Sequence, residues 1–289
     1  MQRYLALQKI VELGSFSKAA EALGYTQSAT SQMIASLENE LSIKLLNRSH
    51  FGAKLTLEGK ELYPFLEQII NAYLLSQEKA REIRGLETGI VRVGLPGSIS
   101  AHWMPQLLKE FQKQYPHVEF VIYTGDYSSI YEWIKNGTVD FGFVAPEASP
   151  GIESTVLTHG IMLALLPPNH PLSEHMIMPL ELLAKEPFIL LEEGQYSEVL
   201  EAFKREGLTP NIKYTIHDND TIMTMVEAGL GVSILSELAM HRTYYNFEYC
   251  PTDPPLFRKI AIGYKSRSHL PIAAQTFIKF MQSQVQNLP

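Results

Sequence analysis

Residues 14–41 read GSFSKAAEALGYTQSATSQMIASLENEL, and this stretch decides the first part of the fold. Two apolar periodicities flank a short turn at Gly24. Ser15 precedes the first of them as a candidate N-cap, and Thr26 precedes the second. Because the turn between the two helices is tight and contains glycine, the pattern predicts a helix-turn-helix.

The second helix carries short uncharged polar side chains where a surface helix usually carries Lys and Glu. One face is its core face: Thr30, Ile34, Leu37 and Leu41. Another face is small or polar: Ser28, Ser31, Gln32, Ala35 and Asn39. Gln pairs with adenine through two hydrogen bonds, and small residues permit close docking in a major groove. The pattern favours a DNA-reading helix, and for this helix alone an ordinary solvated helix is an equal alternative.

A wing and a long helix follow. Short strands are predicted at Leu45–Arg48 and Lys54–Thr56, and Thr56 is a candidate cap for a helix that runs to about Arg84. Its apolar residues repeat at intervals of three and four: Leu62, Phe65, Leu66, Ile69, Tyr73 and Ile83. So long a stripe favours pairing with a second copy of the helix, and packing on its own domain is the alternative.

Beyond a break at 85–89, strands alternate with helices. Strands are predicted at Val91–Leu95, Val118–Ile122, Val139–Val144, Ile161–Leu166, Phe188–Leu191, Lys213–Ile216, Gly231–Leu235 and Ile260–Tyr264. Helices are predicted at Ala101–Tyr115, Tyr127–Asn136, Tyr196–Glu206, Thr221–Ala228 and Pro271–Gln284. This alternation predicts a parallel α/β sheet with right-handed crossovers.

Charge and cysteine content narrow the functional classes. The 289 residues carry a net charge of -7, which alone argues against nucleic-acid binding. Residues 1–60, however, hold seven Lys or Arg against five Glu, so the head is slightly basic on an acidic body. Cys250 is the single cysteine, and the first residues form neither a signal peptide nor a membrane span. We therefore expect a cytoplasmic protein.

Catalytic and metal motifs do not stand out in the body. The histidines are scattered without metal-ligand spacing, and neither a nucleophile elbow nor a phosphate loop is present. Cys250 precedes Pro251 in a stretch expected to be irregular. The sequence therefore predicts a binding domain, with no enzyme activity, no cofactor and no metal site.

Strand ends in the body suit a small ligand, because ligands of open α/β sheets bind beyond the carboxyl ends of the strands. The first strand leads into residues 96–100, where backbone N–H groups, Ser98 and Ser100 suit an organic anion. Ser100 is equally a candidate N-cap, and helix capping is the favoured alternative for Asp220. The predicted effector-binding residues are Ser98, Ile99, Ser100, Thr124, Ala145, Leu191 and Asp220.

The head resembles a known family. The motif consists of Gly14–Ala20, Leu23-Gly24, Gln27-Ser28, Ser31–Ile34, Leu37-Glu38, Leu41–Arg48 and Leu55–Gly59. It resembles the winged helix-turn-helix of the LysR-type transcriptional regulators. More loosely, 136–143 and 226–232 are similar to their effector domain. The resemblance implies an all-α winged head at 1–58, a linker and dimerisation helix at 59–88, and an effector-binding α/β domain at 89–289. That last domain is expected to have two lobes, like a periplasmic solute-binding protein.

The same resemblance implies roles for single residues. Gln27, Ser28, Ser31 and Gln32 read bases or contact the groove. Ser15, Ser17 and Lys18 contact phosphates near the start of the first of the two helices, and Arg48 and Lys54 contact them from the wing. Thr26 is a further candidate DNA-binding residue. Ser28 stands where the family often has Pro, and Ala35-Ser36 where it often has cations. Fewer cations imply a shallower salt dependence of DNA binding.

The expected function is DNA-binding transcriptional regulation in response to a small-molecule effector. The family usually binds an interrupted inverted repeat as a dimer, often as a dimer of dimers (a homotetramer), and RNA polymerase is a candidate partner. From another class, the alternative is a cytoplasmic solute-binding or enzymatic α/β protein whose helical head only mediates assembly.

Overall fold

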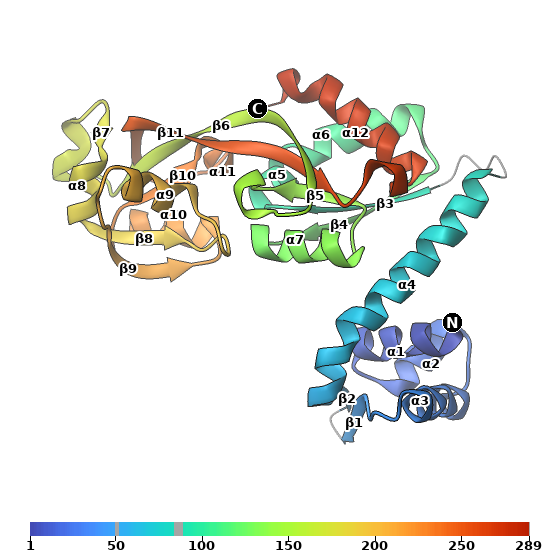
Figure 1. Ribbon diagram of the computed structural model, residues 1–289. Helices are drawn as coiled ribbons and strands as arrows, with labels where there is room; N and C mark the ends of the chain where they lie inside the picture. Colours follow the sequence, from blue (N-terminus) through green and yellow to red (C-terminus); the bar gives the residue numbers. More distant parts are fainter. Residues whose placement is uncertain (50–51, 84–88, 289) are drawn as a thin grey trace. The chain divides into compact units, whose positions relative to one another are not determined.

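The computed structural model describes residues 1–49, 52–83 and 89–288 (Figure 1). The chain divides into two compact units, the first built on residues 1–85 and the second on most of the remaining chain. The predicted break at 85–89 lies, up to residue 88, outside the described residues.

The first unit contains helices and a two-stranded wing. Its elements are α1 (Gln2–Leu13), α2 (Phe16–Leu23), α3 (Gln27–Leu41), β1 (Leu46–Ser49), β2 (Gly52–Leu55) and α4 (Leu57–Ile83). The antiparallel wing pairs Leu46 with Leu55 and Arg48 with Ala53. Residues 50 and 51, at the tip of the wing, lie outside the described residues. The predicted helix-turn-helix and the wing are therefore confirmed.

The predicted helix caps of this unit are confirmed. The Ser15 hydroxyl accepts a hydrogen bond from the Lys18 amide at 3.4 Å, and the Thr26 hydroxyl accepts one from the Ala29 amide at 3.1 Å. Thr56 accepts one from the first turn of α4 at 2.8 Å. Each cap satisfies a helix amide that has no partner inside its helix, which fixes where α2, α3 and α4 begin.

The core of the head forms where α1, α2 and α3 meet the wing. Its buried members include Leu7, Ile10, Phe16, Ile34, Leu37, Leu45 and Leu66. The fully buried Thr30 belongs to the same face of α3, and its hydroxyl donates to the carbonyl of Thr26 at 3.1 Å. Because that bond satisfies the buried hydroxyl, a polar residue is tolerated in an apolar face.

Glu38 links the end of α3 to the start of the wing. One oxygen of its half-buried carboxylate accepts from the amide of Leu45 at 2.8 Å and from the amide of Leu46 at 3.1 Å. The Thr56 hydroxyl donates to the carbonyl of Lys44 at 2.6 Å, which holds the same segment from the other side. These bonds fix the wing relative to the recognition helix.

Replacing Glu38 by Ala is expected to loosen the wing, because two amides would lose their acceptor. Charged hydrogen bonds of this kind are worth about 2 kcal/mol, so amide exchange at Leu45 and Leu46 should accelerate about thirtyfold. Hydrogen exchange measured by mass spectrometry on the full chain tests this. Asn39→Ala, at the next and exposed position, is the control; equal exchange in the two variants would contradict the role given to Glu38.

The second unit is an α/β structure with two lobes. The first lobe contains β3 (Gly89–Leu95), α5 (Gly97–His102), α6 (Met104–Gln114), β4 (Val118–Thr124), α7 (Tyr127–Asn136), β5 (Phe141–Val144) and α12 (Ile272–Gln284). The second contains β7 (Met178–Pro179), α8 (Leu180–Lys185), β8 (Pro187–Leu191), α9 (Glu198–Arg205), β9 (Asn211–Ile216), α10 (Asn219–Glu227), β10 (Ser233–Ser236) and α11 (Glu237–Met240).

Two long strands, β6 (Glu153–Leu166) and β11 (Glu248–Tyr264), run side by side through both lobes (Figure 1). The sheet order is β10-β6-β11-β5-β3-β4, and β8 pairs with β9 separately. Strands β3, β4 and β5 pair in parallel, and so do β8 and β9, but β6 pairs antiparallel with β10 and β11, and β11 antiparallel with β5. The prediction of a purely parallel sheet is therefore wrong, and the sheet is mixed.

The physical reason lies in the composition of β6 and β11. The first half of β6, 153–160, is mostly exposed and lacks an apolar run, so the sequence predicts a strand only from Ile161. The first half of β11 contains three prolines at 251–255. Because proline is rare within strands, the sequence predicts an irregular stretch there. Cys250, placed by the sequence in that stretch, is instead buried in β11 opposite Ala164.

The predicted helix Ala101–Tyr115 is two helices. Helix α5 begins earlier, at Gly97, with Pro96 as its N-cap, so Ser100 lies inside the helix and is not its cap. Trp103 lies between α5 and α6, and Pro105 stands in the first turn of α6. Proline starts a helix well but cannot continue one, which explains the break.

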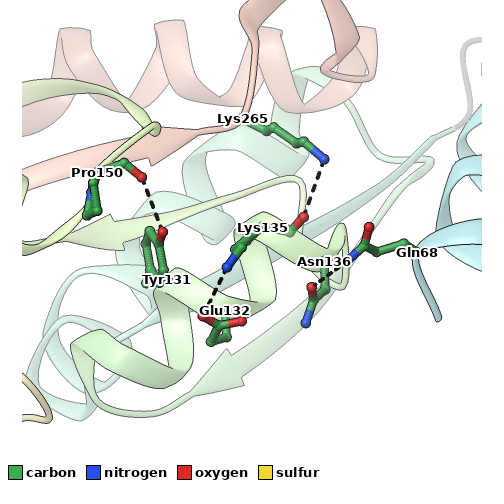
Figure 2. Close-up of polar contacts among 7 residues, drawn as sticks. All are labelled: Gln68, Tyr131, Glu132, Lys135, Asn136, Pro150 and Lys265. Carbon is green, nitrogen blue, oxygen red and sulfur yellow. Dashed lines mark hydrogen bonds and ion pairs between the residues drawn. The ribbon is translucent and has the colours of Figure 1, made fainter. Parts of the chain in front are cut away.

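Helix α7 is fixed to the first lobe by its polar residues. The Tyr131 hydroxyl donates to the carbonyl of Pro150 at 3.2 Å, and the Lys265 ammonium donates to the carbonyl of Lys135 at 3.5 Å (Figure 2). Asp126 accepts from the Ser129 amide at 2.7 Å at the start of the helix. Together these bonds hold the segment just after β4, which lines the cleft described below.

Candidate functional sites

The recognition helix α3 exposes the side chains that the sequence singles out. Gln27, Ser28 and Gln32 are exposed and Ser31 is half-buried, whereas Ile34 and the rest of the core face are buried. Thr26 is exposed too, with its hydroxyl engaged in the cap. The structure therefore brings these side chains together on the solvent side of α3, where the exposed Gln27, Ser28 and Gln32 present hydrogen-bonding groups of the kind that pair with base edges.

The candidate phosphate contacts lie around that helix. Ser17 and Lys18 are exposed on α2, and Lys54 is exposed on β2. The Ser15 hydroxyl is engaged as the cap of α2. Arg48 lies in β1, but its side chain is outside the described residues.

Arg3 and Lys9 are engaged elsewhere, in ion pairs with Glu40 at 2.6 Å and Glu12 at 2.7 Å. Within residues 1–49 and 52–83, Lys18 and Lys54 form no ion pair, so their charge is available to phosphates.

The second unit contains a cleft of about 450 Å³ between its lobes. Three of the predicted effector residues line it: Ser98, Thr124 and Leu191. Four do not: Ile99, Ser100, Ala145 and Asp220. Ile99 and Ala145 are buried, with 2% and 1% of their surface exposed, and Asp220 is exposed on α10. Asp218, not Asp220, caps α10, with an oxygen that accepts from the Thr221 amide at 2.7 Å.

Sequence reasoning missed Arg258, the buried cation of the cleft. It lies on β11 with 4% of its surface exposed and donates from Nη2 to the Ser98 hydroxyl at 2.9 Å. Its Nε is buried without a hydrogen-bond partner, and it forms no ion pair with any residue that the structure describes. The sequence pattern could have revealed it. Leu256, Arg258 and Ile260 alternate along the strand and so share one face, and a charged residue between two apolar residues on that face points toward the interior.

Acidic residues surround this cation at greater distance. Burial, together with the negative charges of Glu198 and Glu192 and against the opposing charge of Arg258, raises the pKa of Glu193 to about 8. Burial also raises the pKa of Glu198, whose Oε2 is buried without a partner. Burial raises the pKa of the Tyr127 hydroxyl as well. The cleft and its surroundings therefore contain several ionisable side chains with perturbed pKa values, and such clusters are common at ligand-binding sites.

One end of the cleft is closed by direct contact between the lobes. The Ser128 hydroxyl accepts from the Gln195 amide at 2.8 Å, and the Tyr127 amide donates to the Glu193 carbonyl at 3.2 Å. Gly194, between these residues, has a φ of +90° and leaves no room for a Cβ beside Ser128. Glycine is therefore required for this close approach.

Other classes of site receive no support from the described residues. They contain no cluster of three or more His, Cys, Asp or Glu side chains suited to a metal. None of their helices combines the length and the apolar character that crossing a membrane requires.

Two family models match the chain in this order. Residues 1–60 match the bacterial regulatory helix-turn-helix protein of the lysR family, and residues 84–286 match the LysR substrate binding domain. The chain is a LysR-type transcriptional regulator. A relative is the uncharacterised HTH-type transcriptional regulator YvbU of Bacillus subtilis, which is 32% identical over 275 residues, 94% of each chain.

Solved structures agree on the fold of this LysR-type regulator. CbnR, a LysR family transcriptional regulator also solved with its target DNA, matches 98% of each chain with a TM-score of 0.72 and 19% identity. The Synechocystis PCC6803 CcmR regulatory domain in complex with 2-PG covers 69% of this chain and 99% of its own, with a TM-score of 0.64 and 20% identity.

Membership of the LysR family decides between the two functions that the sequence left open, a DNA-binding regulator and a solute-binding or enzymatic α/β protein. The LysR-type regulators bind DNA through the head and an effector through the second domain, and they are not enzymes. The predicted family, fold class and regulatory function are therefore confirmed. The individual DNA-contact and effector-contact residues stay predictions.

Replacing Gln32 by Ala is expected to relax base recognition and to leave the fold intact, because the side chain is exposed. A bidentate contact to a base contributes about 1–3 kcal/mol of discrimination. Fluorescence anisotropy with a panel of single-base operator variants measures it: the variant should lose its preference at one position of each half-site. Gln114→Ala, on α6 in the second unit, is the matched control. An unchanged preference at every position would refute the base-reading role.

Proposed function

We propose that this LysR-type regulator responds to a small organic anion whose negative group binds Arg258 and the Ser98 hydroxyl. The observation that carries the proposal is the buried guanidinium without an ion pair in the lining of the cleft. Burying a charge is costly unless it is paired, so an anionic ligand would supply what the protein itself does not. The complex of the related CcmR domain with 2-PG supports a small ligand in such a domain.

A ligand in this cleft would link the two lobes. Ser98 belongs to α5 of the first lobe, Leu191 ends β8 of the second, and Arg258 lies on β11, which crosses between them. An occupant that contacts all three favours one arrangement of the lobes over others. We propose that this two-state preference is what the effector uses to change promoter output.

For the head, we propose that two copies bind an interrupted inverted repeat, one half-site each. Ser31 and the exposed Gln27, Ser28 and Gln32 would read base edges, while Lys18 and Lys54 hold phosphates. The further contacts in this proposal are Ser15, Ser17, Thr26 and Arg48. We further propose that the protein is cytoplasmic, that it assembles as a dimer of dimers and that it contacts RNA polymerase.

Helix α4 supports self-association. Leu66 belongs to the core of the head and Ile70 is buried, whereas Phe65 and Ile69 are 63% and 46% exposed one turn apart. The exposed Ala72 extends this outer stripe. The apolar repeat of α4 therefore divides into an inner face that packs on its own domain and an outer face that a second copy of α4 would cover.

The effector proposal predicts different effects for two serines. Thermal-shift screening of small organic acids should find a ligand that stabilises the full chain. Ser98→Ala should weaken its binding about tenfold, because it removes a hydroxyl from the anion site, whereas Ser100→Ala should not. Arg258→Lys, which keeps the buried charge, should also weaken binding. A ligand that stabilises the wild type and Ser98→Ala equally would refute the proposed anion site.

The dimer proposal is tested by Phe65→Glu. A charge in the outer stripe would be buried without a partner in a helix pair, so the variant is expected to sediment as a smaller species in analytical ultracentrifugation. Lys60→Glu, at an exposed position on another face of α4, should keep the wild-type mass. Unchanged association of Phe65→Glu would exclude this stripe as the interface.

A further inference from the structure

The cleft carries more negative than positive groups. Asp126, Glu192, Glu193 and Asp218 line it together with a single Arg, a formal excess of three negative charges. A ligand with negative groups alone would gain one cation and face four carboxylates. At separations of a few ångström such repulsion is not screened away in a partly buried site.

The four carboxylates are not equivalent. Asp126, Asp218 and Glu192 each accept a backbone amide through one oxygen, at 2.7, 2.7 and 3.2 Å. The Glu193 carboxylate has no hydrogen-bond partner among residues 89–288. Glu193 is half-buried, and it lies near enough to Arg258 for the charge of the guanidinium to act on it. The cleft therefore holds a carboxyl group without a hydrogen bond near a guanidinium without an ion pair.

We propose that the effector is an amino acid, with its carboxylate on Arg258 and Ser98 and its ammonium on Glu193. This inference rests on the proposed function of the cleft and narrows its ligand from an organic anion to a zwitterion. Charge-assisted hydrogen bonds would form at both ends of the ligand, and neither the buried Arg258 nor the half-buried Glu193 would stay without a counter-charge. A volume of about 450 Å³ suits a molecule of this size.

The titration of Glu193 gives the binding a pH signature. Burial and the charges of Glu198 and Glu192 raise the pKa of Glu193 to about 8, against the opposing charge of Arg258, so the protonated form dominates at pH 7. The amide of Tyr127, from the facing helix, contacts only the Glu193 backbone. A bound ammonium favours the carboxylate, so binding releases a proton, and affinity rises from pH 6 to pH 8.

Isothermal titration calorimetry on the full chain tests the proposal, with each of the twenty protein L-amino acids as probe. At least one is expected to bind. Its 2-hydroxy acid, which lacks the ammonium, and its decarboxylated amine should each bind about tenfold more weakly or worse. Titrations in buffers of different ionisation enthalpy should show proton release at pH 7.

Glu193→Gln is the decisive variant, because it keeps the shape and removes the charge. It should lose about tenfold in affinity for the amino acid, lose the rise from pH 6 to 8, and bind the 2-hydroxy acid as the wild type does. Glu181→Gln, on α8 in an exposed pair with Lys185, is the matched control and should change neither affinity.

Two results would overturn the proposal, and they differ in what else they affect. If 2-hydroxy or dicarboxylic acids bind in a Ser98-dependent manner and no amino acid does, the zwitterion is wrong and the anion site stands. If neither amino acids nor organic acids bind or stabilise the chain, the proposed function of the cleft falls with it.

Discussion

The buried guanidinium of Arg258 is the constraint on which the effector domain depends. The side chain is only 4% exposed, because Arg258 alternates with Leu256 and Ile260 on the buried face of β11. Its position on that strand fixes the charge in place. Its bond to Ser98 reaches from the strand that crosses both lobes into the first turn of α5. The cleft therefore has a fixed positive centre, and the acidic loops of both lobes are arranged around it.

The head was largely predictable from sequence because local interactions determine it. Ser15, Thr26 and Thr56 cap their helices within three residues of themselves, so cap and periodicity appear together in the sequence. In the sequence, Glu38 stands out only as part of the Leu37-Glu38 motif. Its bonds to Leu45 and Leu46 span seven and eight residues, and no local pattern reveals such a contact.

The body was less predictable because its decisive contacts are distant. Strands β6 and β11 pair across about a hundred residues, and the polar start of one and the prolines of the other conceal their length. Strand ends correctly predicted Ser98, Thr124 and Leu191 as cleft residues, since carboxyl ends of parallel strands meet at one edge. Ser100 and Asp220 are not the helix caps that the sequence offered as alternatives, because each helix begins at a different residue from the one expected.

Two groups in the cleft would gain from a ligand that carries the opposite charges. Arg258 is buried without an ion pair, and burial keeps Glu193 largely protonated at neutral pH, so neither group compensates the other. The zwitterion proposed above would satisfy both in one step, and that gain would depend on Ser98 from one lobe and Glu193 from the other being held at the ligand together. The affinity of the bound arrangement would then exceed that of any arrangement in which the lobes are apart, and this difference would be the free energy available to bias the regulator between two states.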